Sequence, residues 1–529
     1  MEKVTFGEKL DRIFNRGFFF VFLGLFLITF IGGAITVAVF GELGLDYPMP
    51  VYRVILRFAA LFLSFAALAA LFIAASRFLQ SDRAKRLDDR AFNTKLLVAG
   101  VLLMLAVQLV FAFCLEMNPI TDVRRIDIYA AKIVTDNSFD CLDADFNTRY
   151  IIRYQNNLTM LFLVTAVYKI TYLLTGTVSH APLIVLNVLS LNAAVWMTVM
   201  LSRRLFGGRK AVLTLLLCAL FTPYYTYTPY FYTDSFSIPL TVGTVYAFIA
   251  AVQSKTRMKK IMLLLLSGAL CFIGFKIKGS VIILIPAVIL YLLLHFGIRR
   301  AVKTASVLLL CFSVLLAASS VALKPAHLIS DESSDRYQFP PAHWVMMGLK
   351  DFGAYNAEDS DFTESFPTMK ERKEANLQKI GERIREKGFI GMVAHIGKKA
   401  VWTYMDGTYY IANYLENYQH WTPLHSFILY EGKYRFIFFA YSFGYQLFLL
   451  LMIAFSGLHS LRKRQPTVST LLRLALFGMF LFFLIWETNA RYPFNFTPFY
   501  ILLATESIGP FSARIKVPAR LCRKTKKSA

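Results

Sequence analysis

Runs of about 17 to 25 apolar residues recur along the whole 529-residue sequence, and they limit the possible folds more than any other feature. About 20 apolar residues are needed for a helix to cross a bilayer, and a helix satisfies its own backbone hydrogen bonds there. With 57% hydrophobic and only 17% charged residues, the chain is predicted to be an all-α polytopic membrane protein. The predicted spans are residues 17–40, 52–76, 96–115, 182–202, 211–222, 236–253, 261–275, 280–297, 303–322, 434–456, 470–486 and 493–508.

The net charge of +24 comes largely from short basic runs beside the apolar segments, as in cytoplasmic loops of membrane proteins. Each basic run is separated from the next by an even number of predicted spans, so all of them are expected on one side. This pattern predicts two cytoplasmic termini and no nucleic-acid partner. The basic runs are Arg77–Lys95, Arg203–Lys210, Lys255–Lys260, Arg299–Lys303, Arg462–Arg464 and Arg514–Lys527.

One apolar run, residues 158–174, does not fit this topology, because counting it as a span would place Arg203–Lys210 outside. We therefore expect a helix that lies in the outer leaflet with both ends external. The alternative is a true span that is compensated by a span missed elsewhere. On the first interpretation the chain exposes two large external loops, residues 116–181 and 323–433, and loops of this length usually carry function.

The sequence divides into four predicted parts. They are residues 1–95 with two spans and a cytoplasmic loop, 96–322 as the membrane core, 323–433 as the late external loop, and 434–529 with the last spans and a basic tail. Residues 1–16 are expected to be an uncleaved cytoplasmic lead-in, because no small-residue cleavage site follows them. The six cysteines include no CxxC pair, and three lie inside apolar runs, so no disulfide framework or thiolate metal site is indicated.

Four polar patches fall on the side that is predicted to be external. The residues in them are Asp122, Arg124, Arg125 and Tyr129 in the first, Asp234 in the second, Lys276 and Lys278 in the third, and Glu487, Arg491 and Tyr492 in the fourth. A random scatter of polar residues would be divided between the two faces, so this one-sidedness favours a single external site. Asp122 directly follows a span, where a carboxylate is costly without a task or a partner, and is the leading candidate for a catalytic base.

Each patch also has a purely structural interpretation. The two aspartates could be ordinary helix N-caps, and the two lysines could extend to lipid headgroups. Arg491 could pair with Glu487, since the i,i+4 spacing joins them on one face of a helix. The tyrosines between residues 224 and 232 could form an aromatic belt at the membrane surface.

Taken in order, these features resemble the GT-C superfamily of membrane glycosyltransferases. The resemblance extends over residues 96–505 and rests on short motifs. These motifs are Pro119-x-x-Asp122 with Tyr129-Ala-Ala after an apolar span, an apolar juxtamembrane helix, a span ending in Ser202-Arg-Arg-Leu-Phe-Gly-Gly-Arg-Lys210, Pro223, Asp234 at the next span, and the late Glu487…Arg491-Tyr492. Two features depart from the commonest pattern: no second acid adjoins Asp122, and two extra spans precede residue 96.

The resemblance implies a GT-C-like fold and an enzyme that takes a sugar from a polyprenyl-phosphate carrier on the outer face of a bacterial plasma membrane. It implies that Asp122 is the catalytic position and that Asp234 is an auxiliary position, which in some members binds metal. No cofactor is certain, and the departures leave dependence on a divalent metal open. The expected partners are a polyprenyl-phosphate-linked sugar donor, the lipid bilayer, and an acceptor that is a cell-wall polymer, a glycolipid or a protein.

The residue types suit this chemistry. A carboxylate at the water boundary can take the proton of an acceptor hydroxyl, and a leaving phosphate needs positive charge. Arg491 is the favoured phosphate ligand, because a guanidinium matches phosphate with two hydrogen bonds whereas an ammonium acts as a point charge. The other candidate phosphate ligands are Lys278, Lys276, Arg124 and Arg125, and the candidate supporting residues are Glu487, Tyr492 and Tyr129. A single displacement would invert the anomeric centre.

Two other classes of membrane protein also have about twelve spans. A transporter should show halves related by a repeat, and the sequence shows no such repeat. A lipid-linked polysaccharide polymerase or ligase would place its chemistry in the late external loop, on His327, Arg336 or His343, rather than on the early Asp122.

Overall fold

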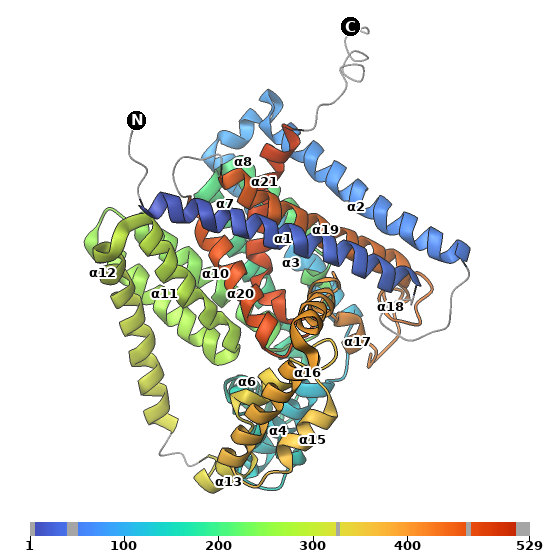
Figure 1. Cartoon of the computed structure of the whole chain (residues 1–529), viewed down its shortest axis with the longest axis vertical. Helices are drawn as coiled ribbons and strands as arrows, with labels where there is room; N and C mark the ends of the chain where they lie inside the picture. The colour runs from blue at the N-terminus through green and yellow to red at the C-terminus, as the bar shows by residue number, and fades with distance from the viewer. Residues whose placement is uncertain (1–5, 40–50, 324–327, 462–466, 515–529) are drawn as a thin grey trace.

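The computed structural model describes residues 6–39, 51–323, 328–461 and 467–514 (Figure 1). Within these ranges the regular structure is helical, apart from one isolated antiparallel bridge between Met117 and Tyr418. The prediction of an all-α polytopic membrane protein is confirmed.

Each predicted span falls mainly on a helix of the bundle. These helices are α1 (Phe6–Val39), α2 (Val51–Gln80), α3 (Arg90–Cys114), α7 (Ala181–Phe206), α8 (Gly208–Ala219), α10 (Thr233–Val252), α11 (Arg257–Ile277), α12 (Leu284–Leu323), α19 (Arg435–Ser460), α20 (Ser469–Ile485) and α21 (Thr497–Ser512). α12 holds two predicted spans, because the positive φ of 70° at Gly297 breaks it. The described ranges contain nine helices long and apolar enough to cross a membrane, with α12 counted once and α6 included; α8, α20 and α21 are shorter.

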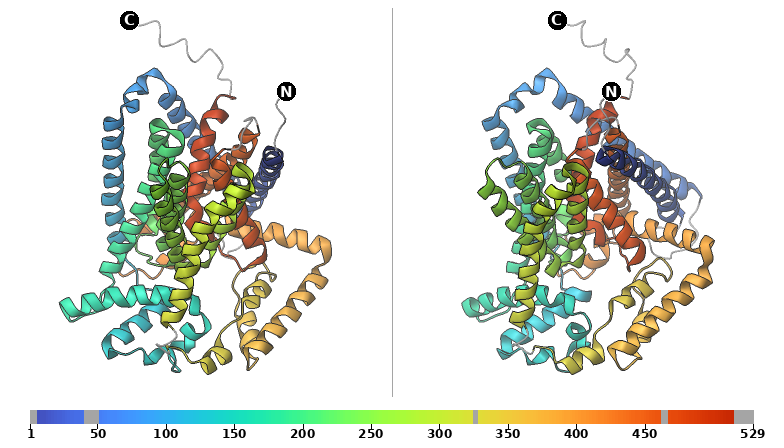
Figure 2. Two further views of the ribbon diagram at one scale, coloured as in Figure 1. Left: turned by 90° about the vertical axis from the view of Figure 1, so that its left-hand side faces the viewer. Right: turned by 60° about the vertical axis from the view of Figure 1, so that its left-hand side comes forward.

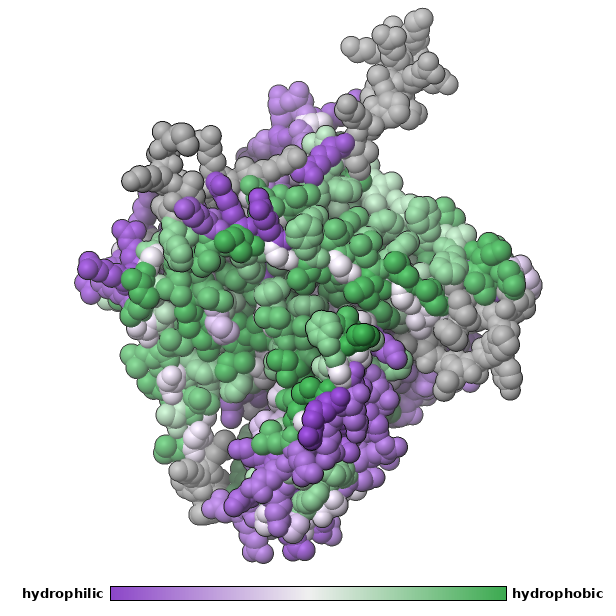
Figure 3. Space-filling view, viewed as in Figure 1, coloured by the Kyte–Doolittle hydropathy of each residue, from purple (hydrophilic) through white to green (hydrophobic). Residues whose placement is uncertain are grey.

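An apolar belt crosses the face of the bundle that Figure 3 shows. Large hydrophobic side chains of the spans point outward within it, among them Leu103 at 67% and Leu310 at 64% exposure. A water-soluble protein would bury most of such surface, so the belt is the part of the molecule that faces lipid.

Polar contacts hold the helices together at one end of the bundle, which we call the basic end. There Arg77 donates to Ser512 Oγ at 2.7 Å, Arg209 binds Asp88 at 2.5 Å, and Arg203 donates to Thr94 Oγ1 at 2.8 Å. The predicted basic runs at 462–464 and, apart from Arg514, at 514–527 lie outside the described residues.

The opposite end, which we call the loop end, carries a layer of further helices, most of them short (Figure 2). They are α4 (Thr121–Asp136), α5 (Tyr150–Arg153), α6 (Leu158–Thr175), α13 (Asp331–Tyr337), α14 (Pro341–Met347), α15 (Ala357–Glu364), α16 (Met369–Tyr404), α17 (Ile411–Leu415) and α18 (His425–Ile428). The remaining short helices are α9 (Pro223–Thr226), η1 (Asp82–Asp88), η2 (Asp140–Leu142), η3 (Asn147–Arg149), η4 (Gln155–Asn157), η5 (Gly279–Ile283) and η6 (Tyr492–Phe496).

The two long loops at this end interlock. The carbonyl of Arg153 accepts from the Phe339 N–H at 3.3 Å, and its guanidinium pairs with Glu364. Gln155 donates to Ser334 Oγ at 3.0 Å. Residues 116–181 and 328–433 therefore form one packed layer rather than two separate loops.

α6 lies across the direction of the spans, at the margin of the bundle (Figure 2). It packs along α4, and Tyr168 of α6 donates to Asp127 Oδ1 at 2.5 Å. This orientation agrees with the expectation of a helix lying in one leaflet, although α6 is long and apolar enough to cross a membrane.

We predict that α6 does not cross. Cysteines introduced at Asn156 and Ser179, which flank α6, should both react with an impermeant thiol reagent added outside intact cells. A cysteine at Lys255, in the basic run between α10 and α11, is the protected control. Labelling at Asn156 with protection at Ser179 would show that α6 is a span.

Candidate functional site

The four predicted polar patches meet at the loop end. One guanidinium joins two carboxylates: Arg491 Nη2 lies 2.9 Å from Asp122 Oδ2, and Arg491 Nη1 lies 3.4 Å from Asp234 Oδ2. Lys278 Nζ pairs with the other oxygen of Asp234. The result is a compact cluster of two acids and two bases.

The two carboxylates sit in the first turns of helices. Asp122 is the second residue of α4 and Asp234 the second of α10, where the positive end of the helix dipole favours a negative charge. Neither is an N-cap, because the capping residues are Ile120 and Tyr232 and neither cap makes a side-chain bond. The N-cap alternative is wrong for both residues.

The two cations come from breaks between helices. Lys278 follows α11 in an extended conformation, and its N–H still binds the carbonyl of Gly274 at 2.7 Å. Arg491 precedes η6, whose second residue is Pro493, a position where proline is well tolerated. Such breaks let long basic side chains turn into the cluster instead of extending along the helix surface.

Exposure distinguishes the two acids. The Asp122 side chain is 33% exposed, whereas Asp234 is 2% and Arg491 10% exposed. Asp122 is thus the carboxylate that solvent or a substrate can reach, while Asp234 is enclosed between its two cationic partners.

Aromatic rings surround the guanidinium. Arg491 Cζ lies 5.2 to 5.6 Å from the ring centres of Tyr232, Tyr414 and Tyr492, within cation–π range. Tyr230 stacks on Tyr414 with ring centres 4.3 Å apart, and its hydroxyl accepts from Arg491 Nη1 at 3.2 Å. The rings fix the guanidinium plane without adding charge.

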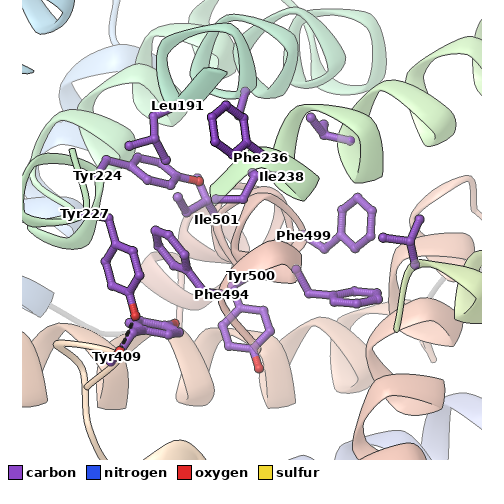
Figure 4. Close-up of a cluster of buried hydrophobic side chains, with 14 of the residues drawn as sticks. Leu191, Tyr224, Tyr227, Phe236, Ile238, Tyr409, Phe494, Phe499, Tyr500 and Ile501 are labelled. Carbon is purple, nitrogen blue, oxygen red and sulfur yellow. Dashed lines mark hydrogen bonds between the residues drawn. The ribbon is translucent and has the colours of Figure 1, made fainter. Parts of the chain in front are cut away.

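The tyrosines from residue 224 to 232 are not a membrane belt. Tyr224, Tyr227, Tyr230 and Tyr232 are buried inside the protein. Figure 4 shows Tyr224 and Tyr227 in a cluster of buried apolar side chains, where the Tyr227 hydroxyl donates to the Tyr409 carbonyl. The belt alternative is therefore wrong for these four, and they form a rigid backing to the charged cluster.

A chain of hydrogen bonds that the sequence did not indicate connects buried side chains to Asp122. Tyr150 donates to Asp122 Oδ1 at 3.0 Å and accepts from Asn157 Nδ2 at 2.8 Å. The Asn157 oxygen in turn accepts from Tyr232 at 3.3 Å. No local motif marks Tyr150 or Asn157, because their relation to Asp122 exists only after the first long loop has folded back onto α4.

Four predicted residues make no hydrogen bond or ion pair with Asp122 or Asp234 in the described part of the chain. Arg125 donates to Asn147 Oδ1 at 2.6 Å, and Tyr129 donates to the Phe146 carbonyl at 2.8 Å. Both therefore hold the loop that follows α4. Arg124 is exposed on α4, and Lys276 is half-buried in the last turn of α11.

Glu487 and Tyr492 support the cluster from one side. The Tyr492 hydroxyl lies 2.8 Å and 3.1 Å from the two Glu487 oxygens, and Lys278 Nζ lies 5.5 Å from the Tyr492 ring centre. Burial raises the pKa of the Glu487 carboxyl to about 7, although the hydrogen bond from Tyr492 opposes the shift. Residues 487–491 are not helical, so the proposed i,i+4 pairing of Glu487 with Arg491 is wrong.

A family described as conserved hypothetical integral membrane protein matches residues 11–510. The chain belongs to this family. Its membership agrees with the apolar belt and the helical bundle. No curated protein matches the chain significantly in sequence.

Among solved structures, the chain is similar to ArnT from Cupriavidus metallidurans, in a crystal structure bound to undecaprenyl phosphate. The two chains are 14% identical, 78% of each is covered, and the TM-score is 0.35. A TM-score of this size does not establish a shared fold, so the functional argument rests on the chain's own residues.

The donor atoms at the cluster do not form a metal site of the usual kind. No group of three His, Cys, Asp or Glu side chains that could hold a metal exists in the part of the chain that the structure describes. The two carboxylates present already face a guanidinium and an ammonium, and a divalent cation would have to compete with both.

Two of the late-loop residues that would indicate a polymerase, His343 and Arg336, are not part of the cluster. His343 is buried, with Nδ1 2.7 Å from Thr363 Oγ1, and burial lowers its pKa to about 4. Arg336 lies over the ring of Tyr337 at 5.4 Å. His327 lies outside the described residues.

The raised pKa of Glu487 predicts how stability depends on pH. The unfolded chain releases this proton near pH 4.5 and the folded chain only near pH 7, so the contribution of Glu487 to stability is full below pH 4.5 and is lost as the pH rises through 7. Glu487→Gln should therefore stabilise the protein at pH 8 by about 1 to 3 kcal/mol and have little effect at pH 4.5. Melting temperatures in detergent at the two pH values would measure this difference.

Glu382→Gln is the matched control, because Glu382 pairs with Lys379 at 3.0 Å and its pKa is lowered by that partner and Gln378. It should give no gain at pH 8. Equal losses of stability for Glu487→Gln at both pH values would contradict the assignment.

Proposed function

We propose that this protein is an inverting glycosyltransferase that moves a sugar from a polyprenyl-phosphate carrier to an acceptor at the outer face of a bacterial plasma membrane. The observation that carries the proposal is the contact of Arg491 with both Asp122 and Asp234, with Lys278 beside them, at one end of an apolar helical bundle. An exposed carboxylate and two cationic side chains thus lie side by side where the spans end, which supports the roles of base and phosphate ligands proposed for them.

Asp122 is the proposed base. Its carboxylate is the exposed acid of the cluster, and Tyr150 and Arg491 each hold one of its oxygens. General-base catalysis requires a carboxylate held within hydrogen-bond reach of the hydroxyl that attacks. Asp234 is too enclosed to meet an acceptor, so its proposed role is to position Arg491 and Lys278.

Arg491 and Lys278 are the proposed ligands of the carrier phosphate. Their charges balance those of the two aspartates, so an added phosphate competes with the carboxylates for N–H groups. Asp122 has one cationic partner and a third of its side-chain surface exposed. The phosphate can therefore displace Asp122 from its cation more easily than it can displace Asp234.

The proposed chemical step transfers the sugar from the phosphate to the acceptor oxygen. The acceptor oxygen forms a bond to the anomeric carbon while the bond from that carbon to the phosphate oxygen breaks. The acceptor proton passes to Asp122, and the electron pair of the broken bond stays on the phosphate, which the two cations stabilise. One displacement inverts the anomeric centre.

The class of acceptor, whether cell-wall polymer, glycolipid or protein, would follow from mass spectrometry of envelope glycans from cells with and without the protein.

Asp122→Asn should lower sugar transfer by at least about 10²-fold, because general-base catalysis contributes that much. Loss of the sugar from the envelope glycan at normal protein level would be the readout. Asp127→Asn is the matched control, since Asp127 also lies on α4 and accepts from a buried tyrosine, Tyr168. Near-normal transfer by a folded Asp122→Asn protein would contradict the assignment.

Arg491→Lys should weaken binding of undecaprenyl phosphate by about tenfold, and Arg491→Ala should weaken it further, because charged hydrogen bonds to phosphate are lost. Native mass spectrometry of the purified protein with added undecaprenyl phosphate measures this. Arg473→Lys is the control, because Arg473 is also a buried arginine, paired with Glu506 at 3.5 Å but at the basic end.

If Arg491→Ala and Glu487→Ala lower the melting temperature to a similar degree and leave lipid binding intact, the segment is a structural clamp. In that case the phosphate site would lie elsewhere on the protein.

A further inference from the structure

The long helix α16 is interrupted at one residue, and its two parts differ in composition and in surroundings. Gly388 has φ of 56° and ψ of −172°, which interrupts the helix between residues 369–387 and 389–404. The first part is rich in both acidic and basic residues, whereas residues 389–404 contain no acidic residue. We call residues 389–404 the arm.

Three polar side chains of the arm face inward, whereas Lys398 is exposed. His395, Lys399 and Thr403, spaced four apart along one stripe, are all buried. His395 Nε2 lies 3.0 Å from the Gly348 carbonyl, Lys399 donates to the Trp486 carbonyl at 2.6 Å, and the hydroxyls of Thr403 and Thr488 are 2.9 Å apart.

The apolar side chains at the first residues of the arm face outward. Phe389 is 84% and Ile390 82% exposed, more than any other large hydrophobic residue of the described chain, and Val393 is 56% exposed. A helix on a water-facing surface presents the opposite arrangement, with its polar face outward. The inverted polarity of the arm therefore indicates an apolar medium outside it.

The position of the arm identifies this medium. The C-terminal end of the arm lies against the bundle, where Val401 packs closely against Gly32 of α1. At about 1.5 Å per residue the arm is roughly 24 Å long. The other end of the arm, at the bend of α16, projects from the margin of the bundle, where the apolar belt meets the hydrophilic layer (Figures 2 and 3). The exposed apolar stripe thus continues the lipid-facing surface of the spans.

We propose that residues 389–404 lie in the bilayer interface at the loop end, with Phe389, Ile390 and Val393 among the acyl chains of that leaflet. Exposed Lys398 on the arm, and Arg385 just before the bend, are placed to meet lipid phosphates. The partner is the lipid of one leaflet, and the proposal does not depend on the enzymatic activity.

The arm also ties the charged cluster to the lipid surface. Its inward stripe holds the backbone carbonyl of Trp486 and the side chain of Thr488, a few residues before Arg491 in the same connection. Because these contacts are buried and direct, the depth of the arm in the leaflet sets the depth of Arg491.

The test is a measurement of depth. A nitroxide label on Phe389→Cys, in nanodiscs of phosphatidylcholine and phosphatidylglycerol, should collide more with oxygen than with a water-soluble nickel chelate, as lipid-exposed labels do. The matched control is Ile384→Cys, a 45% exposed position before the bend, which should show the opposite preference. The unsubstituted protein, labelled in parallel, supplies the background from its native cysteines.

Ile390→Cys provides a second reading and should behave as Phe389→Cys does. Equal access of the nickel chelate at positions 389 and 384 would place the arm in water and overturn the proposal. Spin–spin broadening at 389 that appears only when two copies share a nanodisc would also overturn it, because a second copy of the chain would then cover the stripe.

Discussion

The contact of Arg491 with two carboxylates is the interaction on which the loop end depends. It joins the start of α4, the start of α10 and the connection between α20 and α21, and Lys278 adds the end of α11. Charges removed from water are costly unless they are paired and hydrogen-bonded, so each of these side chains requires the others. The cluster is stable only when segments hundreds of residues apart have come together.

The surroundings of the cluster explain why it can be both rigid and accessible. Buried tyrosines and phenylalanines pack together inside the bundle behind it (Figure 4). The Tyr150–Asn157 chain supports Asp122 from the first loop. Solvent reaches it mainly at Asp122. At the basic end, Arg473 and Glu506 form a comparable pair that is almost completely enclosed, as suits a purely structural role.

The two parts of α16 show how the surrounding medium determines sequence pattern. Before Gly388 most of the exposed residues of α16 are charged, and after it most are apolar, while His395, Lys399 and Thr403 face inward. The inward stripe satisfies carbonyl groups near α20, and those groups belong to the segment that carries Glu487 and Arg491. Contact with the membrane and the geometry of the charged cluster are therefore linked through one helix.

The sequence alone determined the membrane class, the segments that become spans and the four polar patches, because apolar runs and charge asymmetry are local properties. It did not determine that Lys278 and Arg491 enter the cluster while Lys276, Arg124 and Arg125 do not. Nor did it reveal Tyr150 and Asn157. Those outcomes depend on where helices break and on contacts between distant segments, such as the 369 residues that separate Asp122 from Arg491, and only tertiary packing decides them.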